Sequence, residues 1–333
     1  MYSTSQPVAS RVSFRARAFS KTTVASRPLM AVAGRGAALS PVLLSAARPG
    51  VNRGLSLLSP VPKDTRTTPV HEHTGGGQVR GEWLHERGGG DSVPDPASGR
   101  PILYYLHGSG YVICSPRTHR GLVSRLTHRS GIGAFSLDYR MGPEHRWPAA
   151  GDDAIRGYRW LLRQGFDAKQ IVVAGDSAGG HLALDLIASN HLDGVPQPRA
   201  MMLFSPLYDP SFELARQLEA SGVRDPLIDV AGARRFLDLY SGAADPNHPR
   251  MRVKLSSDMD LPPALIQVGA REIMADDART IHRLLLDAGG ESELQEWRGQ
   301  GHVFQMFPYF SSESRTAVRE AANFIAAHSH TSP

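Results

Sequence analysis

Cysteine is almost absent from this sequence of 333 residues, which contains only Cys114. A single cysteine cannot form an internal disulfide, and it cannot supply the several thiolates of a structural zinc site. Long apolar runs are absent as well. The run at 37–47 is short and is interrupted by Pro41, so it cannot cross a bilayer. We therefore expect no disulfide framework, no thiolate zinc site and no transmembrane segment.

Acidic residues are absent from the first 63 positions, although the whole chain contains 32 of them. The same positions hold nine of the 37 lysines and arginines: Arg11, Arg15, Arg17, Lys21, Arg27, Arg35, Arg48, Arg53 and Lys63. Without these nine, the rest of the chain has a net charge near −4, so the formal charge of +5 comes from the N-terminal segment. This distribution argues against nucleic-acid binding by the globular part.

The N-terminal segment, residues 1–75, is also rich in serine and alanine, which is typical of an organelle transit peptide. The sequence RAFS at 17–20 resembles a mitochondrial cleavage site, and no secretory signal is visible. A leader without structure and a partial cap over the folded domain are the alternatives. We expect an intracellular protein, which is mitochondrial if the segment is a transit peptide and cytoplasmic otherwise.

Short apolar runs alternate with helical patterns from residue 79 onward. Strands are predicted at 79–84, 101–106, 134–137, 171–174, 201–204, 264–268 and 294–297. Helices are predicted around 122–126, 150–162, 182–187, 278–285 and 317–325. This alternation indicates a mostly parallel sheet covered on both faces, in one α/β domain over 76–330. The loop-rich stretch 206–255 interrupts the pattern, and we interpret it as a cap inserted between two strands.

The sequence GDSAG at 175–179 has the G-x-S-x-G form of a serine nucleophile. The pattern alone is weak, because glycine and serine are common enough to produce it by chance. Here it follows an apolar run and precedes a helical pattern, which is the strand-turn-helix context that the motif requires. Glycines flank the serine because side chains there would collide across a tight turn. We predict Ser177 as the catalytic nucleophile.

A second glycine-rich turn, HGSGY at 107–111, directly follows the predicted strand at 101–106. Small residues allow the backbone to direct its amides toward a substrate oxygen. We expect such amides, together with that of Ala178, to hold the negative charge of a tetrahedral intermediate. A simple glycine turn after a strand is the alternative.

The catalytic base should be a histidine, because its pKa allows it to take and return a proton near neutral pH. Of the 14 histidines, His302 ends a glycine loop, GQGH at 299–302, that follows the last predicted strand. It also comes after Ser177 in the chain, as the order serine, acid, histidine requires. Other histidines lie in the oxyanion turn or beside helices, where a structural role is simpler. We predict His302 as the base.

The acid that orients this histidine should lie just after the strand at 264–268. Three carboxylates follow that strand, Glu272, Asp276 and Asp277. Glu272 is still within the turn, whereas the two aspartates fall where the next helix begins and have a structural role available at its N-terminus. We assign Glu272 as the third catalytic residue, with Asp276 as the alternative.

Together these motifs resemble the hormone-sensitive-lipase family of α/β hydrolases, which combines an HGGG-type oxyanion loop with a GDSAGG nucleophile elbow. The elbow at 175–180 matches completely, and the resemblance extends over residues 79–327. Further matching segments are DYR at 138–140, PEH at 143–145, PAA at 148–150, LPP at 261–263 and GHVF at 301–304. The resemblance implies the α/β-hydrolase fold, with a mostly parallel central sheet, helices on both faces and a cap.

The resemblance also implies hydrolysis of a short- or medium-chain acyl ester of a small organic molecule, with no metal and no organic cofactor. It implies that the amides of Gly108, Ser109 and Ala178 form the oxyanion hole. An acetyl ester of a secondary metabolite is one such substrate. The chain departs from the family at Ser109, which replaces a glycine and is expected to narrow the pocket, and at Glu272, where aspartate is usual. Tyr111 is expected to line the acyl or alcohol pocket, with a packed aromatic as the alternative.

Two other functions share these motifs. An amidase of the kynurenine formamidase type has the same elbow and oxyanion loop. A non-catalytic receptor on the same fold, like the gibberellin receptors, has lost the catalytic histidine, whereas His302 is present here. A protein that uses its basic tail for interaction with membranes or organelles is a further alternative. The sequence leaves the natural ester and the oligomeric state open.

Overall fold

The structure is a computed structural model that describes residues 6–8, 12–14, 17, 41–86 and 93–328. Its strands are β1 Gln6–Val8, β2 Thr65–Thr74, β3 Gly77–Glu86, β4 Ile102–Leu106, β5 Gly133–Leu137, β6 Ile171–Asp176, β7 Ala200–Phe204, β8 Ala264–Gly269 and β9 Ser292–Trp297. Its helices include α2 Pro41–Leu58, α3 Pro116–Ser130, α4 Ala149–Arg163, α5 Ala178–Leu192, α6 Glu213–Ala220, α7 Val230–Ser241, α8 Ala275–Asp287 and α9 Ser312–Ala327. Every strand and helix predicted from the sequence has its counterpart here.

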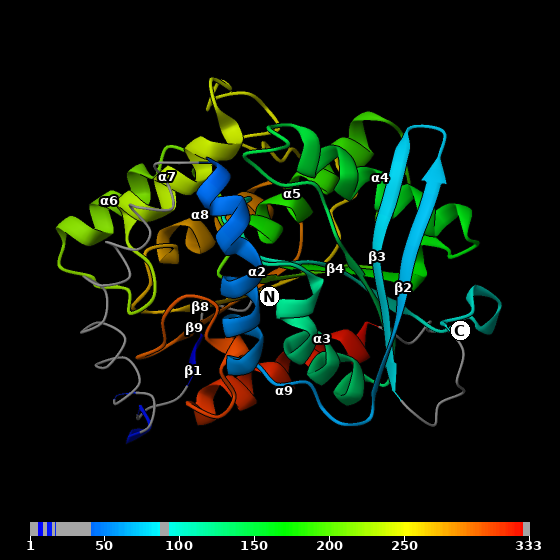
Figure 1. The fold of residues 1–333 in the computed structure, drawn as a ribbon, viewed down its shortest axis with the longest axis horizontal. Helices are drawn as coiled ribbons and strands as arrows, with labels where there is room; N and C mark the ends of the chain where they lie inside the picture. The colour runs from blue at the N-terminus through cyan, green and yellow to red at the C-terminus, as the bar shows by residue number, and fades with distance from the viewer. Residues whose placement is uncertain (1–5, 9–11, 15–16, 18–40, 87–92, 329–333) are drawn as a thin grey trace.

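The strands form one sheet in the order β1-β9-β8-β7-β6-β4-β5-β3-β2 (Figure 1). In this sheet order, all neighbouring strands from β1 through β9, β8, β7, β6 and β4 to β5 are parallel. The pairs β5 with β3 and β3 with β2 are antiparallel. Parallel strands end at the same edge of a sheet, so the turns that follow β4, β6, β8 and β9 lie at one edge. The predicted catalytic residues are on these four turns.

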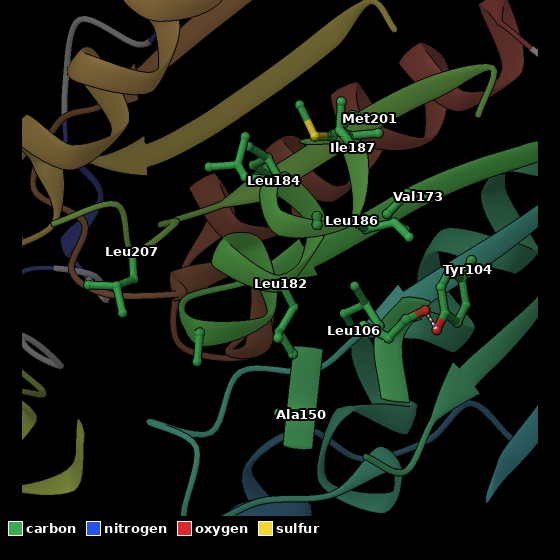
Figure 2. Close-up of a cluster of buried hydrophobic side chains, with 14 of the residues drawn as sticks. Tyr104, Leu106, Ala150, Val173, Leu182, Leu184, Leu186, Ile187, Met201 and Leu207 are labelled. Carbon is green, nitrogen blue, oxygen red and sulfur yellow. Dashed lines mark hydrogen bonds between the residues drawn. The ribbon is translucent and has the colours of Figure 1, made fainter. Parts of the chain in front are cut away.

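The sheet is covered on both faces, which explains the continuous apolar runs of its central strands. In β4 all five side chains are buried, and they alternate between the two layers. Leu103 and Tyr105 pack with α3 and α9, whereas Tyr104 and Leu106 pack with α4 and α5. Figure 2 shows part of the second layer, where the Tyr104 hydroxyl also donates a hydrogen bond to the Ala154 carbonyl at 2.8 Å.

The folded domain begins earlier than the predicted residue 76. β2 pairs with β3 over its whole length, from Thr65 with Glu86 to Thr74 with Gly77, so the domain includes residue 65. The sequence TRTTPVHEHT did not predict a strand because it lacks apolar alternation. It lies at the edge of the sheet, and Val70 is the one residue of β2 that is buried. Edge strands need few apolar residues, because neither face is fully covered.

Helix α2, within the predicted tail, packs beside the segment that follows the oxyanion turn. Arg48 Nε donates to the Val112 carbonyl and Arg48 Nη2 to the Gly142 carbonyl, each at 2.8 Å. Asn52 Oδ1 accepts the Cys114 N–H at 2.9 Å, and Asn52 Nδ2 donates to the Cys114 carbonyl at 3.2 Å. These contacts favour a partial cap for residues 41–58. The expected cleavage site lies, apart from Arg17, outside the described residues, so the targeting interpretation stays a prediction.

The stretch 206–255 lies between β7 and β8, as expected for an insertion, and it contains α6 and α7. Tyr240 of α7 stacks on Tyr111 of the oxyanion turn, with ring centroids 4.3 Å apart. Stacked aromatic rings of this kind contribute about 0.5–1.5 kcal/mol beyond the area that they bury. The insertion is therefore fixed to the turn that carries the predicted oxyanion amides.

Deleting residues 1–63 should lower both stability and ester turnover, because α2 and its bonds to the oxyanion segment are lost. Arg48→Ala, which removes the guanidinium bonds alone, should reduce the free energy of unfolding by about 2 kcal/mol. Arg53→Ala is the matched control, since Arg53 is exposed on the same helix. Thermal unfolding and initial rates on the three variants measure the effect. Full stability and turnover in the deletion variant would contradict this prediction and show that residues 41–58 are dispensable.

Candidate active site

Ser177 occupies a sharp turn between β6 and α5. Its backbone angles are φ 51° and ψ −118°, in a region that residues with a side chain rarely adopt. A Cβ atom at Gly175 would overlap the Gly179 carbonyl oxygen, and one at Gly179 would overlap the Leu106 carbonyl oxygen. Both flanking glycines are therefore required by close backbone packing, which is the local geometry that the motif predicts.

His302 lies in the loop after β9, and its Nε2 is 3.0 Å from Ser177 Oγ. This distance is within hydrogen-bond range, so Nε2 can accept the hydroxyl proton. The next residue, Val303, donates its N–H to Ser205 Oγ at 3.0 Å, which ties the histidine loop to the turn after β7. The structure thus brings together two residues that are 125 positions apart in the chain.

Glu272 lies just after β8 and is fully buried. Its Oε2 accepts hydrogen bonds from Ser205 Oγ at 2.9 Å and from the Gly269 N–H at 3.2 Å. Its Oε1 is 3.8 Å from His302 Nδ1, which is longer than a hydrogen bond. Neither of these two atoms has a hydrogen-bond partner in the described part of the chain. Each is therefore available to the other, and such catalytic bonds often shorten only when substrate is bound.

Buried carboxylates raise the basicity of His302. Burial alone would lower its pKa, but the interaction with Glu272, followed by the charges of Asp225 and Asp176, raises the pKa above the ordinary value of 6.5. Asp225 comes from the segment between α6 and α7, and its Oδ2 accepts the Ile273 N–H at 3.3 Å. Burial also raises the pKa of Asp225, to about 6. These acids favour the imidazolium that forms when the histidine takes a proton.

The two aspartates that follow Glu272 have other partners. Asp276 Oδ1 accepts a hydrogen bond from Arg279 Nη1 at 2.7 Å, one turn further along α8. Asp277 Oδ1 accepts the N–H groups of Tyr208 and Asp209 at 2.7 and 2.8 Å, which anchors the start of the inserted segment. Of the three carboxylates, Glu272 is the one that the structure brings next to His302.

The oxyanion turn requires one correction. The Gly108 N–H, predicted to bind the oxyanion, donates instead to Asp176 Oδ1 at 2.8 Å. A Cβ atom on Gly108 would overlap the Asp176 carboxylate, so this glycine is needed for the contact with the elbow. The N–H groups of Ser109, Gly110 and Ala178 have no hydrogen-bond partner among the described residues. These three amides are therefore available to a substrate.

Asp176, the second residue of the elbow motif, joins the two turns. Its Oδ1 also accepts the Tyr105 hydroxyl at 2.8 Å, and its Oδ2 lies 3.2 Å from His119 Nε2. Burial opposes its charge, but His119 and the donors from Tyr105 and Gly108 outweigh burial and lower the pKa of Asp176. A charged carboxylate with several donors is a firm anchor, so the oxyanion turn and the elbow are held together.

Comparison with known proteins gives the family. The family with the α/β-hydrolase fold matches residues 103–306. An acetyl-hydrolase of Streptomyces hygroscopicus is 36% identical over 249 residues, covering 75% of this chain and 80% of that protein. An esterase of Acinetobacter venetianus is 31% identical over 242 residues, covering 71% and 78%. The crystal structure of an esterase from the bacterial hormone-sensitive-lipase family has 29% identity and a TM-score of 0.78, covering 94% and 98%.

The chain belongs to the hormone-sensitive-lipase family of α/β hydrolases. The predicted resemblance and fold are thereby confirmed, and this family member is a serine carboxylesterase. The formamidase and receptor alternatives receive no support from these relatives, which carry the names of esterases and an acetyl-hydrolase. The esterase contains no helix in the described ranges that is long and apolar enough to cross a membrane.

Tyr111 of the esterase is a packed aromatic, the second of the two interpretations drawn from the sequence. It is 2% exposed. Its hydroxyl lies 2.7 Å from His181 Nδ1. Because His181 Nε2 is 2.7 Å from the Met251 carbonyl, which can only accept, Nε2 carries the proton and Nδ1 accepts from Tyr111. The side chain fixes α5 to the oxyanion turn, and it has no free polar atom to offer a substrate.

Several residues of the site were missed from the sequence. Gly110 was not among the predicted donors, although its amide is one of the free donors. Ser205 and Asp225 lie in stretches without a motif. Ser205 reaches the site because it directly follows β7, and Asp225 reaches it because the inserted segment between α6 and α7 contacts the turn after β8. Phe236 of α7 packs near Gly110, since a Cβ built there would lie 3.1 Å from Phe236 Cδ2. No local sequence pattern indicates these contacts, because each joins separate elements.

Proposed function

We propose that this esterase hydrolyses short-chain acyl esters of small organic alcohols through an acyl-enzyme on Ser177. The observation that carries the proposal is the 3.0 Å distance from His302 Nε2 to Ser177 Oγ at a strained elbow. Relatives named acetyl-hydrolase and ethyl acetate hydrolase, the latter 33% identical over 220 residues, support a short acyl group. A related esterase of 30% identity and TM-score 0.73 was soaked with p-nitrophenyl butyrate.

In the first step, Ser177 Oγ attacks the ester carbonyl while His302 Nε2 takes the hydroxyl proton. The carbonyl oxygen becomes an oxyanion, and the amides of Ser109, Gly110 and Ala178 are the proposed donors to it. Glu272 orients the imidazole through Nδ1 and stabilises its positive charge. The tetrahedral intermediate then expels the alkoxide, which receives the proton from His302 and leaves as the alcohol.

In the second step, water attacks the acyl group on Ser177 while His302 Nε2 accepts a proton from that water. The second tetrahedral intermediate is stabilised by the same amides. Its collapse breaks the bond to Ser177 Oγ, and His302 returns the proton to the serine. The carboxylic acid is released and the enzyme is restored, so the whole cycle consumes one water molecule for each ester.

Phe236 supports the preference for short acyl groups. The ring, carried by α7 of the inserted segment, packs near Gly110 and is only partly buried. An aromatic side chain next to the proposed oxyanion donors restricts the space in which an acyl chain can lie. We therefore propose acyl groups of about two to four carbons, on the analogy of the relatives' substrates.

A series of p-nitrophenyl esters, from acetate to palmitate, tests the proposal. We expect the highest kcat/KM with acetate or butyrate and a fall of about tenfold or more by octanoate. Phe236→Ala should flatten this preference, whereas Phe324→Ala on α9 should leave it unchanged. Highest turnover with palmitate would contradict the short-chain proposal, and hydrolysis of N-formylkynurenine faster than of every ester would favour an amidase.

A further inference from the structure

The side chain of Ser109 points to a role that the family's usual glycine cannot perform. Ser109 is 5% exposed, and its Oγ accepts the Tyr111 N–H at 2.8 Å. The same oxygen lies 2.6 Å from the Tyr139 hydroxyl, which comes from the turn after β5. The hydroxyl is thus enclosed by two hydrogen-bond partners within the protein. This arrangement supports a role for the side chain inside the protein, as an alternative to the expectation that it narrows the substrate pocket.

The direction of each proton in this network is determined by the groups involved. The Tyr139 hydroxyl lies 2.6 Å from the His107 carbonyl, and a carbonyl can only accept, so the tyrosine proton is donated there. The oxygen of Tyr139 must therefore accept the proton of Ser109. The oxygen of Ser109 in turn accepts the Tyr111 N–H. One continuous chain of hydrogen bonds runs from Tyr111 through Ser109 and Tyr139 to His107.

This hydrogen-bond network surrounds Gly110, the residue of the turn with the greatest backbone freedom. Gly110 lies between Ser109 and Tyr111, has φ 51°, and could rotate its peptide groups at little steric cost. The N–H groups of Val112 and Ile113 also donate to the Ser109 carbonyl, each at 3.1 Å, so the serine is held at its backbone as well as at its side chain. The two free amides of the turn belong to Ser109 and Gly110, the residues that this network fixes.

Tyr139 is itself firmly placed. It is 2% exposed, and its ring stacks on the His107 ring with centroids 4.3 Å apart. A bond to a rigid partner transmits that rigidity to the turn, whereas a bond to water or to a mobile side chain would not. The serine hydroxyl therefore connects the oxyanion turn to a fixed point in the domain.

We propose that Ser109 is a positioning residue whose hydroxyl, bonded to Tyr139, holds the amides of Ser109 and Gly110 in the geometry that binds the oxyanion. This inference rests on the proposed function, because it concerns the same intermediate. A glycine at position 109 would lack this hydrogen bond to Tyr139. Catalysis depends on such preorganisation, since donors that must first reorient lose much of their effect on the transition state.

The test compares Ser109→Ala, Tyr139→Phe and the double variant, with wild type and Ser177→Ala in the same assay. Matched controls are Ser124→Ala, a buried serine whose hydroxyl has no partner among the described residues, and Tyr158→Phe, whose hydroxyl bonds the Pro196 carbonyl. Measured quantities are kcat and KM for p-nitrophenyl butyrate, inhibition by a trifluoromethyl ketone whose hemiketal mimics the oxyanion, and thermal unfolding.

We expect both single variants to lower kcat about 10- to 100-fold with KM changed less than about twofold. The ketone should bind more weakly by the same factor as the loss in kcat/KM. The double variant should be no worse than the more impaired single variant, because both act on one network. The two controls should keep the kcat of wild type.

Ser109→Gly distinguishes a positioning role of the Ser109 side chain from a role in narrowing the substrate pocket. A positioning role predicts a lower kcat for every acyl length, whereas a narrowed pocket predicts retained kcat and a shift of substrate preference toward longer chains. Retained kcat in both single variants, or additive losses in the double variant, would contradict the proposed positioning role of Ser109. If Ser109→Ala does not fold, Tyr139→Phe still breaks the same link while keeping the stacked ring. Activity that persists in Ser177→Ala would instead reveal failure of the proposed function.

Discussion

Replacing Ser177 with alanine is expected to leave a folded protein whose ester turnover falls by about ten-thousand-fold or more. The loss is large because the hydroxyl is the proposed nucleophile and no covalent intermediate can form without it. Initial rates with p-nitrophenyl acetate and butyrate, with thermal unfolding as the check on folding, measure the effect. Alanine keeps the Cβ atom, and with it the backbone strain at φ 51°, so stability should stay close to that of wild type.

Ser124→Ala serves as the control for this experiment. It removes the hydroxyl of a buried serine in α3, which belongs to neither the elbow nor the oxyanion turn and has no hydrogen-bond partner among the described residues, so its turnover should match that of wild type. Retained turnover in Ser177→Ala, at more than a few per cent of the wild-type rate, would show that the ester is cleaved by another group. The mechanism proposed above would then be wrong.

Glu272→Gln is expected to lower kcat by about a hundredfold to ten-thousandfold while the fold is kept. The amide has the same shape as the carboxylate and can still accept from Ser205 Oγ and the Gly269 N–H. It cannot stabilise the imidazolium of His302, because the negative charge is gone. Without that charge the pKa of His302 should also fall, so the lower limb of the pH profile of kcat/KM should shift to lower pH.

Two neighbouring substitutions are the controls for Glu272. Asp276→Asn removes an ion pair with Arg279 at the surface and should cost less than about 1 kcal/mol of stability, with little change in kcat. Asp277→Asn keeps an oxygen that can accept from the amides of Tyr208 and Asp209. A large loss of kcat in Asp276→Asn, together with nearly normal turnover in Glu272→Gln, would transfer the catalytic role to the aspartate.

The parts of the site that local motifs encode could be predicted from the sequence. Ser177 was identifiable because the elbow needs glycines at fixed positions between a strand and a helix. His302 and Glu272 were identifiable because each follows a buried strand, and the ends of parallel strands meet at one edge of the sheet. The buried strands themselves were clear for the same reason, since both faces of the sheet are covered and their apolar runs are continuous.

The donors of the oxyanion turn could not be chosen from the sequence, because that choice depends on side chains from distant elements. Asp176, 68 positions further along the sequence, accepts the Gly108 N–H, and Tyr139, 30 positions further along, is hydrogen-bonded to the Ser109 hydroxyl. A glycine motif indicates a turn that can present amides but not which of them the protein itself uses. The exposed strand β2 and the helix α2 escaped prediction for a different reason. Their residues bury little apolar surface, so they produce a weak periodic pattern.

Labelling with a fluorophosphonate tests the central claim most directly, because the reagent reacts only with a serine whose hydroxyl is activated by a base. Intact mass spectrometry followed by peptide mapping should show one adduct per chain, on Ser177, with esterase activity lost in proportion to labelling. His302→Ala should react far more slowly under the same conditions. An adduct on a different serine, or full activity in a chain fully labelled at Ser177, would contradict the account.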